Sequence, residues 1–126
     1  SHPQVADVLN RVRQPFNVNS LALAAAVAAL ADESYLAESR QLNRDGMRQL
    51  EQGLNELGLQ WIPSRGNFIA VDLGRDAGPV YQGLLRAGVI VRPVAGYEMP
   101  NHLRVSIGLR EENQRFLEAL AGVLAQ

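Results

Sequence analysis

Two arginines in one short stretch of the chain have the chemistry best suited to binding a ligand. The stretch Gly88–Gly108 has the pattern of an apolar strand, a loop and a second strand, with Arg92 at the end of the first strand and Arg104 near the start of the second. Guanidinium groups present a planar fork of N–H donors that matches carboxylate and phosphate oxygens. We therefore expect Arg92 and Arg104 to clamp an anionic group. Alternatively, Arg92 caps loop carbonyls and Arg104 lies on the solvated face of an edge strand.

The other polar residues that invite a functional interpretation also have simple structural ones. Asn67 follows a glycine and fits a turn, while Asn17 and Asn19 precede a helix and fit caps. His102 is interpreted as a surface residue of a polar loop, and Tyr97 as a residue that packs the same loop. We find no carboxylate pair, no serine–histidine pair and no glycine-rich phosphate loop. The arginines remain the main candidates.

The composition narrows the classes of function. At 126 residues the chain can form one domain with a real core, and its formal net charge of -1 gives no argument for nucleic acid. The chain has no cysteine and only two histidines, so disulfides are excluded and a zinc site is improbable. No apolar run approaches the roughly 18–20 residues that span a bilayer. We expect a protein that binds neither nucleic acid nor a membrane.

All twelve basic residues are arginines, and the sequence contains no lysine. Arginine cannot replace lysine as a nucleophile, because its guanidinium stays protonated. Schiff-base chemistry and a phosphate-loop lysine are therefore excluded as properties of this chain alone.

The remaining chain has the pattern of a scaffold. Apolar periodicity and capping residues predict helices, and short apolar runs between turns predict strands. From residue 33 onward the expected order is helix, strand, strand, helix, strand, strand, helix. This order predicts an α/β (α+β) fold, a small mixed sheet with helices packed on one face. The expected elements are helices from Pro3, over Leu21–Ala31, from Asp32 to about Leu57, over Pro79–Ala87 and from Glu111, with strands Leu59–Ile62, Phe68–Leu73, Gly88–Arg92 and Leu103–Gly108.

The helix Leu21–Ala31, with Ser20 as its expected N-cap, is apolar on nearly every side. A helix of this kind is normally buried, so we expect it to pack against a missing domain or a second copy of the chain. Residues 1–31 have no strands of their own, which places a domain boundary near Asp32. The chain also opens without methionine in what has the pattern of a helix, which suggests a fragment of a longer protein.

Five segments, taken in order, resemble a known family. They are Pro15–Ala22, Gly66–Ile69, Gly88–Arg92, Leu103–Gly108 and Arg110–Asn113. Single motifs such as Gly-Asn-Phe are weak, but the ordered set is similar to class I/II pyridoxal-phosphate aminotransferases of fold type I. The C-terminal segments are most similar to the histidinol-phosphate aminotransferase branch.

The resemblance implies a C-terminal fragment. Residues 1–31 would be a helical remnant of the large domain with its connector, and residues 32–126 would be the C-terminal small domain. In the family the lysine that forms the Schiff base lies upstream of the connector. Pyridoxal 5'-phosphate is thus implied for the full-length enzyme, with no covalent attachment to this fragment, which we expect to be inactive alone.

The resemblance also assigns roles by position. Arg104 matches the family arginine that binds the anionic end of the substrate, a phosphate in the histidinol-phosphate branch, and Arg92 is its partner. Asn17, Asn19 and Asn67 match positions that shape the domain interface or the site wall. No catalytic residue is assigned to this chain.

The implied function is amino transfer between histidinol phosphate and 2-oxoglutarate in histidine biosynthesis, by a cytoplasmic homodimer that includes a missing N-terminal large domain. The alternatives are another family member, such as an aromatic-amino-acid aminotransferase or a phosphothreonine decarboxylase-like protein, and a stand-alone anion-binding regulatory module. Leu109 departs from the family, where many members have threonine. This removes a helix N-cap that is typically worth about 0.5–2 kcal/mol.

Overall fold

The computed structural model describes residues 2–13 and 16–125, so Gln14 and Pro15 of the predicted connector lie outside the described residues. The chain forms two compact units, residues 1–37 and 38–126, each described by itself. The division falls inside helix α3 (Glu33–Glu56), whose buried residues begin only at Gly46. The boundary between residues 31 and 32 therefore stays a prediction.

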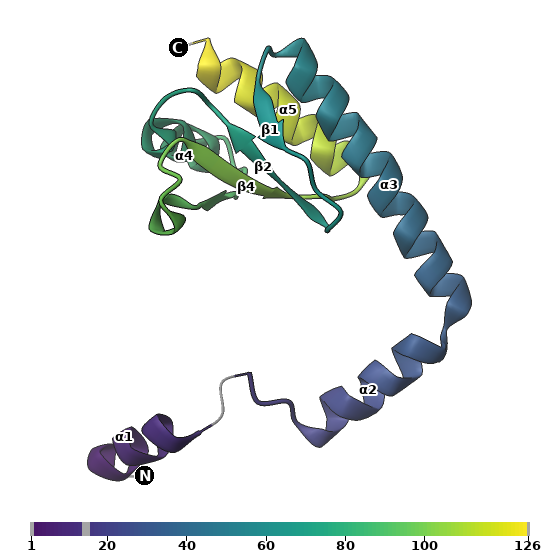
Figure 1. Ribbon diagram of the computed structural model, residues 1–126, viewed down its shortest axis with the longest axis vertical. Helices are drawn as coiled ribbons and strands as arrows, with labels where there is room; N and C mark the ends of the chain where they lie inside the picture. The colour runs from purple at the N-terminus through teal and green to yellow at the C-terminus, as the bar shows by residue number, and fades with distance from the viewer. Residues whose placement is uncertain (1, 14–15, 126) are drawn as a thin grey trace. The chain divides into compact units, whose positions relative to one another are not determined.

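The first unit contains helices α1 (Pro3–Val12) and α2 (Ser20–Ala31), labelled in Figure 1. Asn19, and not Ser20, is the N-cap of α2, because the Asn19 Oδ1 accepts a hydrogen bond from the Ala22 N–H at 2.8 Å. The expected cap at Ser20 is thus wrong by one residue. The large apolar side chains of α2 are exposed, Leu21 to 81%.

Among the described residues, no single helix is long and apolar enough to cross a membrane. Helices α2 and α3 satisfy the length and composition criteria only when they are taken together as a bent pair.

The second unit contains a four-stranded sheet in the order β1 (Gln60–Ile62), β2 (Phe68–Asp72), β4 (His102–Ser106) and β3 (Arg92–Pro93). The fold class is confirmed, but the sheet is antiparallel at every pairing, which corrects the expected mixed sheet. The strands β2 and β3, joined through helix α4 (Ala77–Arg86), run in the same direction. They do not pair, because β4 lies between them.

The strand β3 is much shorter than the expected strand Gly88–Arg92. Gly88 has a φ of +74°, and the Val89 N–H donates to the carbonyl of Leu84 at 2.9 Å, so this segment still completes the end of α4. Ladder pairing begins at Arg92, and Pro93 has no N–H with which to extend it.

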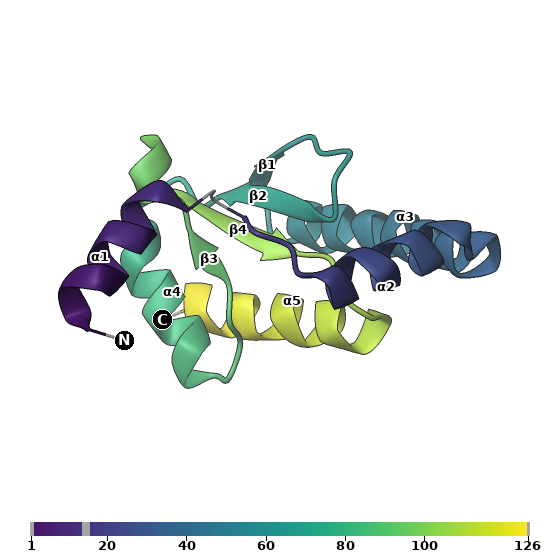
Figure 2. The same cartoon turned by 90° about the horizontal axis from the view of Figure 1, so that it is seen from below.

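Helices cover one face of the sheet, as predicted. Figure 2 shows α4 and α5 (Arg110–Leu124) on one side of the strands, and the buried residues of α3 belong to the same core. The core residues contributed by α3, β2, α4, β4 and α5 are Leu50, Leu54, Ile69, Val71, Val80, Leu84, Leu103, Val105, Phe116 and Leu120.

Two glycines allow α3 to lie close to the turn that precedes α5 and to the middle of α5. A Cβ atom at Gly46 would lie 2.5 Å from the Ile107 Cγ2 and 3.3 Å from the carbonyl oxygen of Gly108. A Cβ atom at Gly53 would overlap the Leu117 side chain. The close approach of the two helices therefore depends on the absence of side chains at these positions.

Candidate functional site

Arg92 and Arg104 are brought together by the register of the sheet. They are directly opposite each other on β3 and β4. Residues that pair across neighbouring strands project from the same face. Leu103 and Val105 point into the core, so both arginines project from the opposite face, as the alternation around Arg104 predicts.

This arrangement places two like charges side by side, which is destabilising in an isolated sheet. Arg92 is exposed and Arg104 is half-buried. Within residues 2–13 and 16–125, neither guanidinium forms an ion pair with a carboxylate. No carboxylate of the described residues therefore occupies the N–H donors of either side chain, and an anion between the two guanidinium groups would relieve the repulsion.

The neighbours of Arg104 on the same face differ in size. Ala70 is opposite Arg104 on β2, and its small side chain leaves the guanidinium open on that side. Phe68, two residues earlier on β2, lies under the guanidinium, with the Arg104 Cζ 4.9 Å from the centroid of its ring. This separation is within the range of a cation–π interaction.

His102 and Asp72 form the next pair of these two strands that lies on the same face as Arg104 and Ala70. The His102 Nε2 lies 3.9 Å from the Asp72 Oδ2, and the side chain of His102 is only 19% exposed. Its Nδ1 is buried without a hydrogen-bond partner among the described residues. The interpretation of His102 as a surface loop residue is therefore wrong, because it begins β4 and pairs with β2.

The three asparagines fall in different places. The carbonyl of Asn67 accepts from the Ile107 N–H at 2.9 Å, so its backbone extends the pairing between β2 and β4. Asn17 and Asn19 belong to the first unit, and Asn19 serves as the α2 cap. A role for these asparagines in the site wall stays a prediction.

A buried asparagine at the start of α5 was missed by the sequence reasoning. Asn113 is 2% exposed, and its side chain holds the turn that leaves β4: its Oδ1 accepts from the Gly108 N–H at 3.0 Å and its Nδ2 donates to the Gly108 carbonyl at 3.1 Å. The same Nδ2 lies 3.2 Å from the Oε1 of Gln49 on α3. The signal was available, because Asn113 shares helical spacing with the buried residues Phe116 and Leu120.

The beginning of α5 compensates for the missing threonine. Leu109 is the N-cap and its side chain has no acceptor, so it leaves the helix N–H groups uncapped. However, the Glu112 Oε2 accepts from the Leu109 N–H at 2.8 Å. This is one of the two hydrogen bonds of a capping box, the one that needs no acceptor on the side chain of the N-cap residue.

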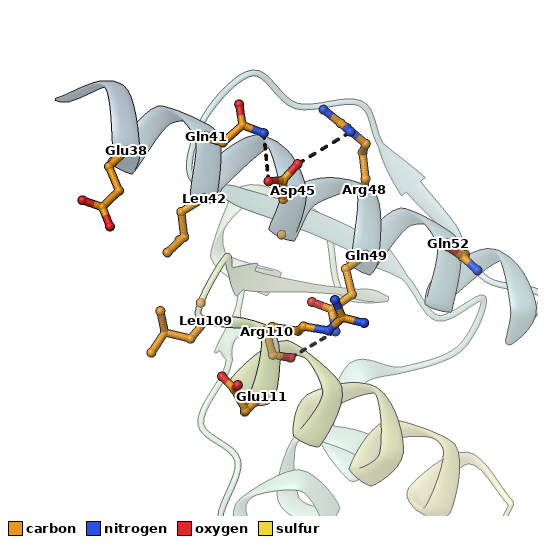
Figure 3. A pocket seen from close by; sticks show the side chains of 12 residues that line it. Glu38, Gln41, Leu42, Asp45, Arg48, Gln49, Gln52, Leu109, Arg110 and Glu111 are labelled. Atoms are coloured by element: carbon orange, nitrogen blue, oxygen red, sulfur yellow. Dashed lines mark hydrogen bonds and ion pairs between the residues drawn. The ribbon is translucent and has the colours of Figure 1, made fainter. Parts of the chain in front are cut away.

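A groove of about 790 Å³ lies between α3 and the start of α5, as Figure 3 shows. The Gln49 side-chain amide crosses it and donates to the Arg110 carbonyl at 3.0 Å, while Asp45 interacts with Gln41 and Arg48. Both signs of charge line the groove, and the described residues hold no cluster of three metal-ligating side chains. The paired arginines do not line this groove.

Comparison with known proteins gives consistent results. Residues 1–120 match the family model described as aminotransferase class I and II. Histidinol-phosphate aminotransferase 2 of Pseudomonas fluorescens (strain Pf0-1) is 77% identical over 126 residues, which is 100% of this chain and 34% of that protein. The enzyme of the same name from Pseudomonas aeruginosa is 77% identical over 125 residues, or 99% of this chain and 34% of that protein. The chain therefore spans about a third of the length of these curated relatives.

Solved structures whose sequences are less similar to this chain give the same result. Histidinol-phosphate aminotransferase from Sinorhizobium meliloti, in complex with pyridoxal-5'-phosphate, has a TM-score of 0.76 and 29% identity over 98% of this chain and 35% of that one. The enzyme of that name from Clostridium acetobutylicum has a TM-score of 0.77 and 25% identity over 95% of this chain and 37% of that one. Because the family model covers nearly all of its residues, this chain belongs to the class I and II aminotransferase family.

Proposed function

We propose that this chain is the C-terminal part of a histidinol-phosphate aminotransferase, in which it binds the anionic end of the substrate. The Arg92–Arg104 pair carries the proposal, since two guanidinium groups face each other on a sheet face that no helix of residues 38–125 covers. The names of the relatives at 77% identity suggest histidinol phosphate as the amino substrate.

The chemistry of the pair suits both substrates of the proposed reaction. A phosphate monoester offers three acceptor oxygens and a charge of about −1.5 to −2 near pH 7. Arg92 and Arg104 can divide these oxygens, because each guanidinium forks toward two acceptors. The carboxylate of 2-oxoglutarate presents fewer oxygens but the same sign of charge. One clamp would therefore hold both molecules in turn, at a fixed distance from the reacting atoms.

The family implies pyridoxal phosphate in the complete enzyme, and this cofactor supplies the electron sink for amino transfer. The residues of this chain do not fit its covalent attachment, because the sequence contains no lysine. No step on the cofactor is therefore assigned to the residues of this chain. Its own residues bind and orient the substrate, and the unit that carries them would close over the site.

The test is an assay of the longer protein that contains this chain. With 2-oxoglutarate as acceptor, we expect a kcat/KM for histidinol phosphate at least about tenfold above that for phenylalanine, which corresponds to about 1.4 kcal/mol of preference. The reverse preference would favour an aromatic-amino-acid aminotransferase. The 126-residue chain, assayed alone with added pyridoxal phosphate, should give no turnover.

A second candidate function is a stand-alone anion-binding module, which the solvent-facing arginine pair also supports. The two candidates differ in what precedes the chain in its gene. A Ser-Lys segment immediately upstream is expected for the aminotransferase and would eliminate the module. A start codon at this position would favour the module.

We also infer that α2 packs against the remainder of the protein or against a second copy, in a homodimer. The exposed apolar side chains of α2, among them Leu21 at 81% and Leu30 at 72%, support this inference. Light scattering on the 126-residue chain should show self-association that grows with concentration. A monodisperse monomer at all concentrations would contradict packing of α2 against a second copy of this chain.

A further inference from the structure

We propose that Phe68 is a positioning residue for anion binding, which holds the guanidinium of Arg104 in place without consuming its hydrogen-bond donors. The inference rests on the proposed anion clamp and adds a residue to it. Its starting point is the separation of 4.9 Å between the Arg104 Cζ and the centroid of the Phe68 ring.

The sheet register makes this contact specific. Phe68 pairs with Ser106, and Arg104 pairs with Ala70, so Phe68 and Arg104 are diagonal neighbours on one face. Diagonal neighbours lie about 7–8 Å apart, a distance that an aromatic ring and a long side chain can bridge. The direct neighbour, Ala70, is too short to support the guanidinium.

The guanidinium of Arg104 needs support because its neighbour on β3 repels it. Arg92 is directly opposite and carries the same charge. A carboxylate beside Arg104 would hold the side chain, but it would also neutralise the charge and occupy the N–H groups that a ligand requires. The face of an aromatic ring attracts the cation through its quadrupole and accepts none of the in-plane N–H groups. Phe68 therefore orients Arg104 and leaves its donors available.

Core packing does not account for the position of Phe68. Its side chain is 39% exposed, and it is absent from the core cluster that holds its strand neighbours Ile69 and Val71. A large apolar side chain on the uncovered face of a sheet gains little from burial here. The contact with Arg104 therefore explains why a phenylalanine occupies this position.

The experiment is a titration of the 126-residue chain with inorganic phosphate, followed by NMR at the arginine Nε–H signals. The variants are Phe68→Leu, which keeps an apolar side chain but removes the ring, and Phe68→Tyr, which keeps the ring. Ile62→Ala is the matched control, because Ile62 is an exposed apolar residue of the same sheet on β1. Far-UV circular dichroism checks that each variant folds.

We expect Phe68→Leu to weaken phosphate binding by about two- to fivefold, the factor that corresponds to a cation–π contact at an exposed site. The upfield ring-current shift of the Arg104 Nε–H should disappear in Phe68→Leu and persist in Phe68→Tyr, which should bind as the parent chain does. Ile62→Ala should leave both measurements unchanged. A purely structural role for Phe68 would not produce the rescue by tyrosine.

Two results overturn the proposal, and they differ in their consequence for the clamp. If Phe68→Leu binds phosphate like the parent chain while Arg104→Gln loses binding, the clamp stands and the role of Phe68 is wrong. If the parent chain and Arg104→Gln respond to phosphate identically, the clamp on this chain is wrong, and the role of Phe68 falls with it.

Discussion

Arg92 and Arg104 are directly opposite each other on neighbouring antiparallel strands, and both project away from the core. Their mutual repulsion destabilises the folded chain when no anion is bound, and it favours the binding of an anion between them. The pair thus links the stability of the sheet edge to the occupancy of the proposed site.

Replacing one member of the pair should separate the two effects. We expect Arg92→Gln to raise the free energy of unfolding by about 0.2–1 kcal/mol without phosphate, because a like-charge contact is removed. The same variant should bind phosphate more weakly, so phosphate should raise its melting temperature less than it raises that of the parent chain. Thermal unfolding with and without phosphate measures both quantities.

Arg40→Gln is the control for this prediction, since Arg40 is an exposed arginine of α3 and the exchange has little effect on helix propensity. This variant lowers the net charge by as much as Arg92→Gln does, but it leaves both Arg92 and Arg104 in place. If Arg40→Gln and Arg92→Gln change stability and phosphate response equally, the effect belongs to net charge and not to the opposed arginines.

The packing of α3 against α5 gives a second prediction. Gly46→Ala should lower the free energy of unfolding by about 1–2 kcal/mol, because the new methyl group meets Ile107 and the Gly108 backbone and the strain of about 1–3 kcal/mol exceeds the gain in helix propensity. Chemical denaturation measures the change.

Gly122→Ala is the matched control, because Gly122 lies in α5 and the methyl group that alanine adds there would have nothing within 4 Å. Helix propensity alone predicts that this variant is more stable by up to about 1 kcal/mol. Equal effects of the two substitutions would mean that α3 and α5 do not approach each other as closely as the structure describes.

The start of α3 gives a prediction about pH. Hydrogen bonds from the Tyr35 N–H and the Ser34 hydroxyl hold the pKa of Asp32 below its usual value of 3.8. A carboxyl whose pKa is lowered by folding stabilises the folded state above its unfolded pKa, and this contribution is lost as the pH falls through the folded pKa. The first turn of α3 should therefore fray on acidification below pH 3.8.

Amide hydrogen exchange at Tyr35, compared between about pH 5 and about pH 2.5, measures the fraying that this linkage predicts. Asp32→Asn keeps an oxygen that can accept from the Tyr35 N–H, but its side chain does not titrate. The protection of the Tyr35 amide against exchange should therefore be the same at both pH values in this variant. Fraying of Asp32→Asn with the same acid midpoint would assign the effect to another group.

The sequence predicted most of the elements and the face from which Arg104 projects, because these depend on local periodicity. The alternation of Leu103 and Val105 with Arg104 is enough to separate the core face from the other face. The expected helices of the second unit also begin and end within a few residues of α3, α4 and α5.

The pairing of Arg92 with Arg104 could not be predicted in the same way. It depends on the register between β3 and β4, two strands that are brought together only when β4 takes its place between β2 and β3. The contact of Arg104 with Phe68 depends on a second register, between β2 and β4. Long-range pairings of this kind leave no periodic signal in a single sequence.

Asn113 gives the last prediction, and it concerns the turn that carries the chain from β4 into α5. Asn113→Ala would remove both hydrogen bonds to Gly108 and the contact with Gln49, and it would leave partly buried polar groups unpaired. We expect the free energy of unfolding to fall by about 1–3 kcal/mol. Gln114→Ala, at the exposed neighbouring position in α5, should change stability by no more than about 0.5 kcal/mol. A double-mutant cycle of Gln49→Ala with Asn113→Ala should show coupling, whereas strict additivity would mean that Asn113 holds the turn without help from α3.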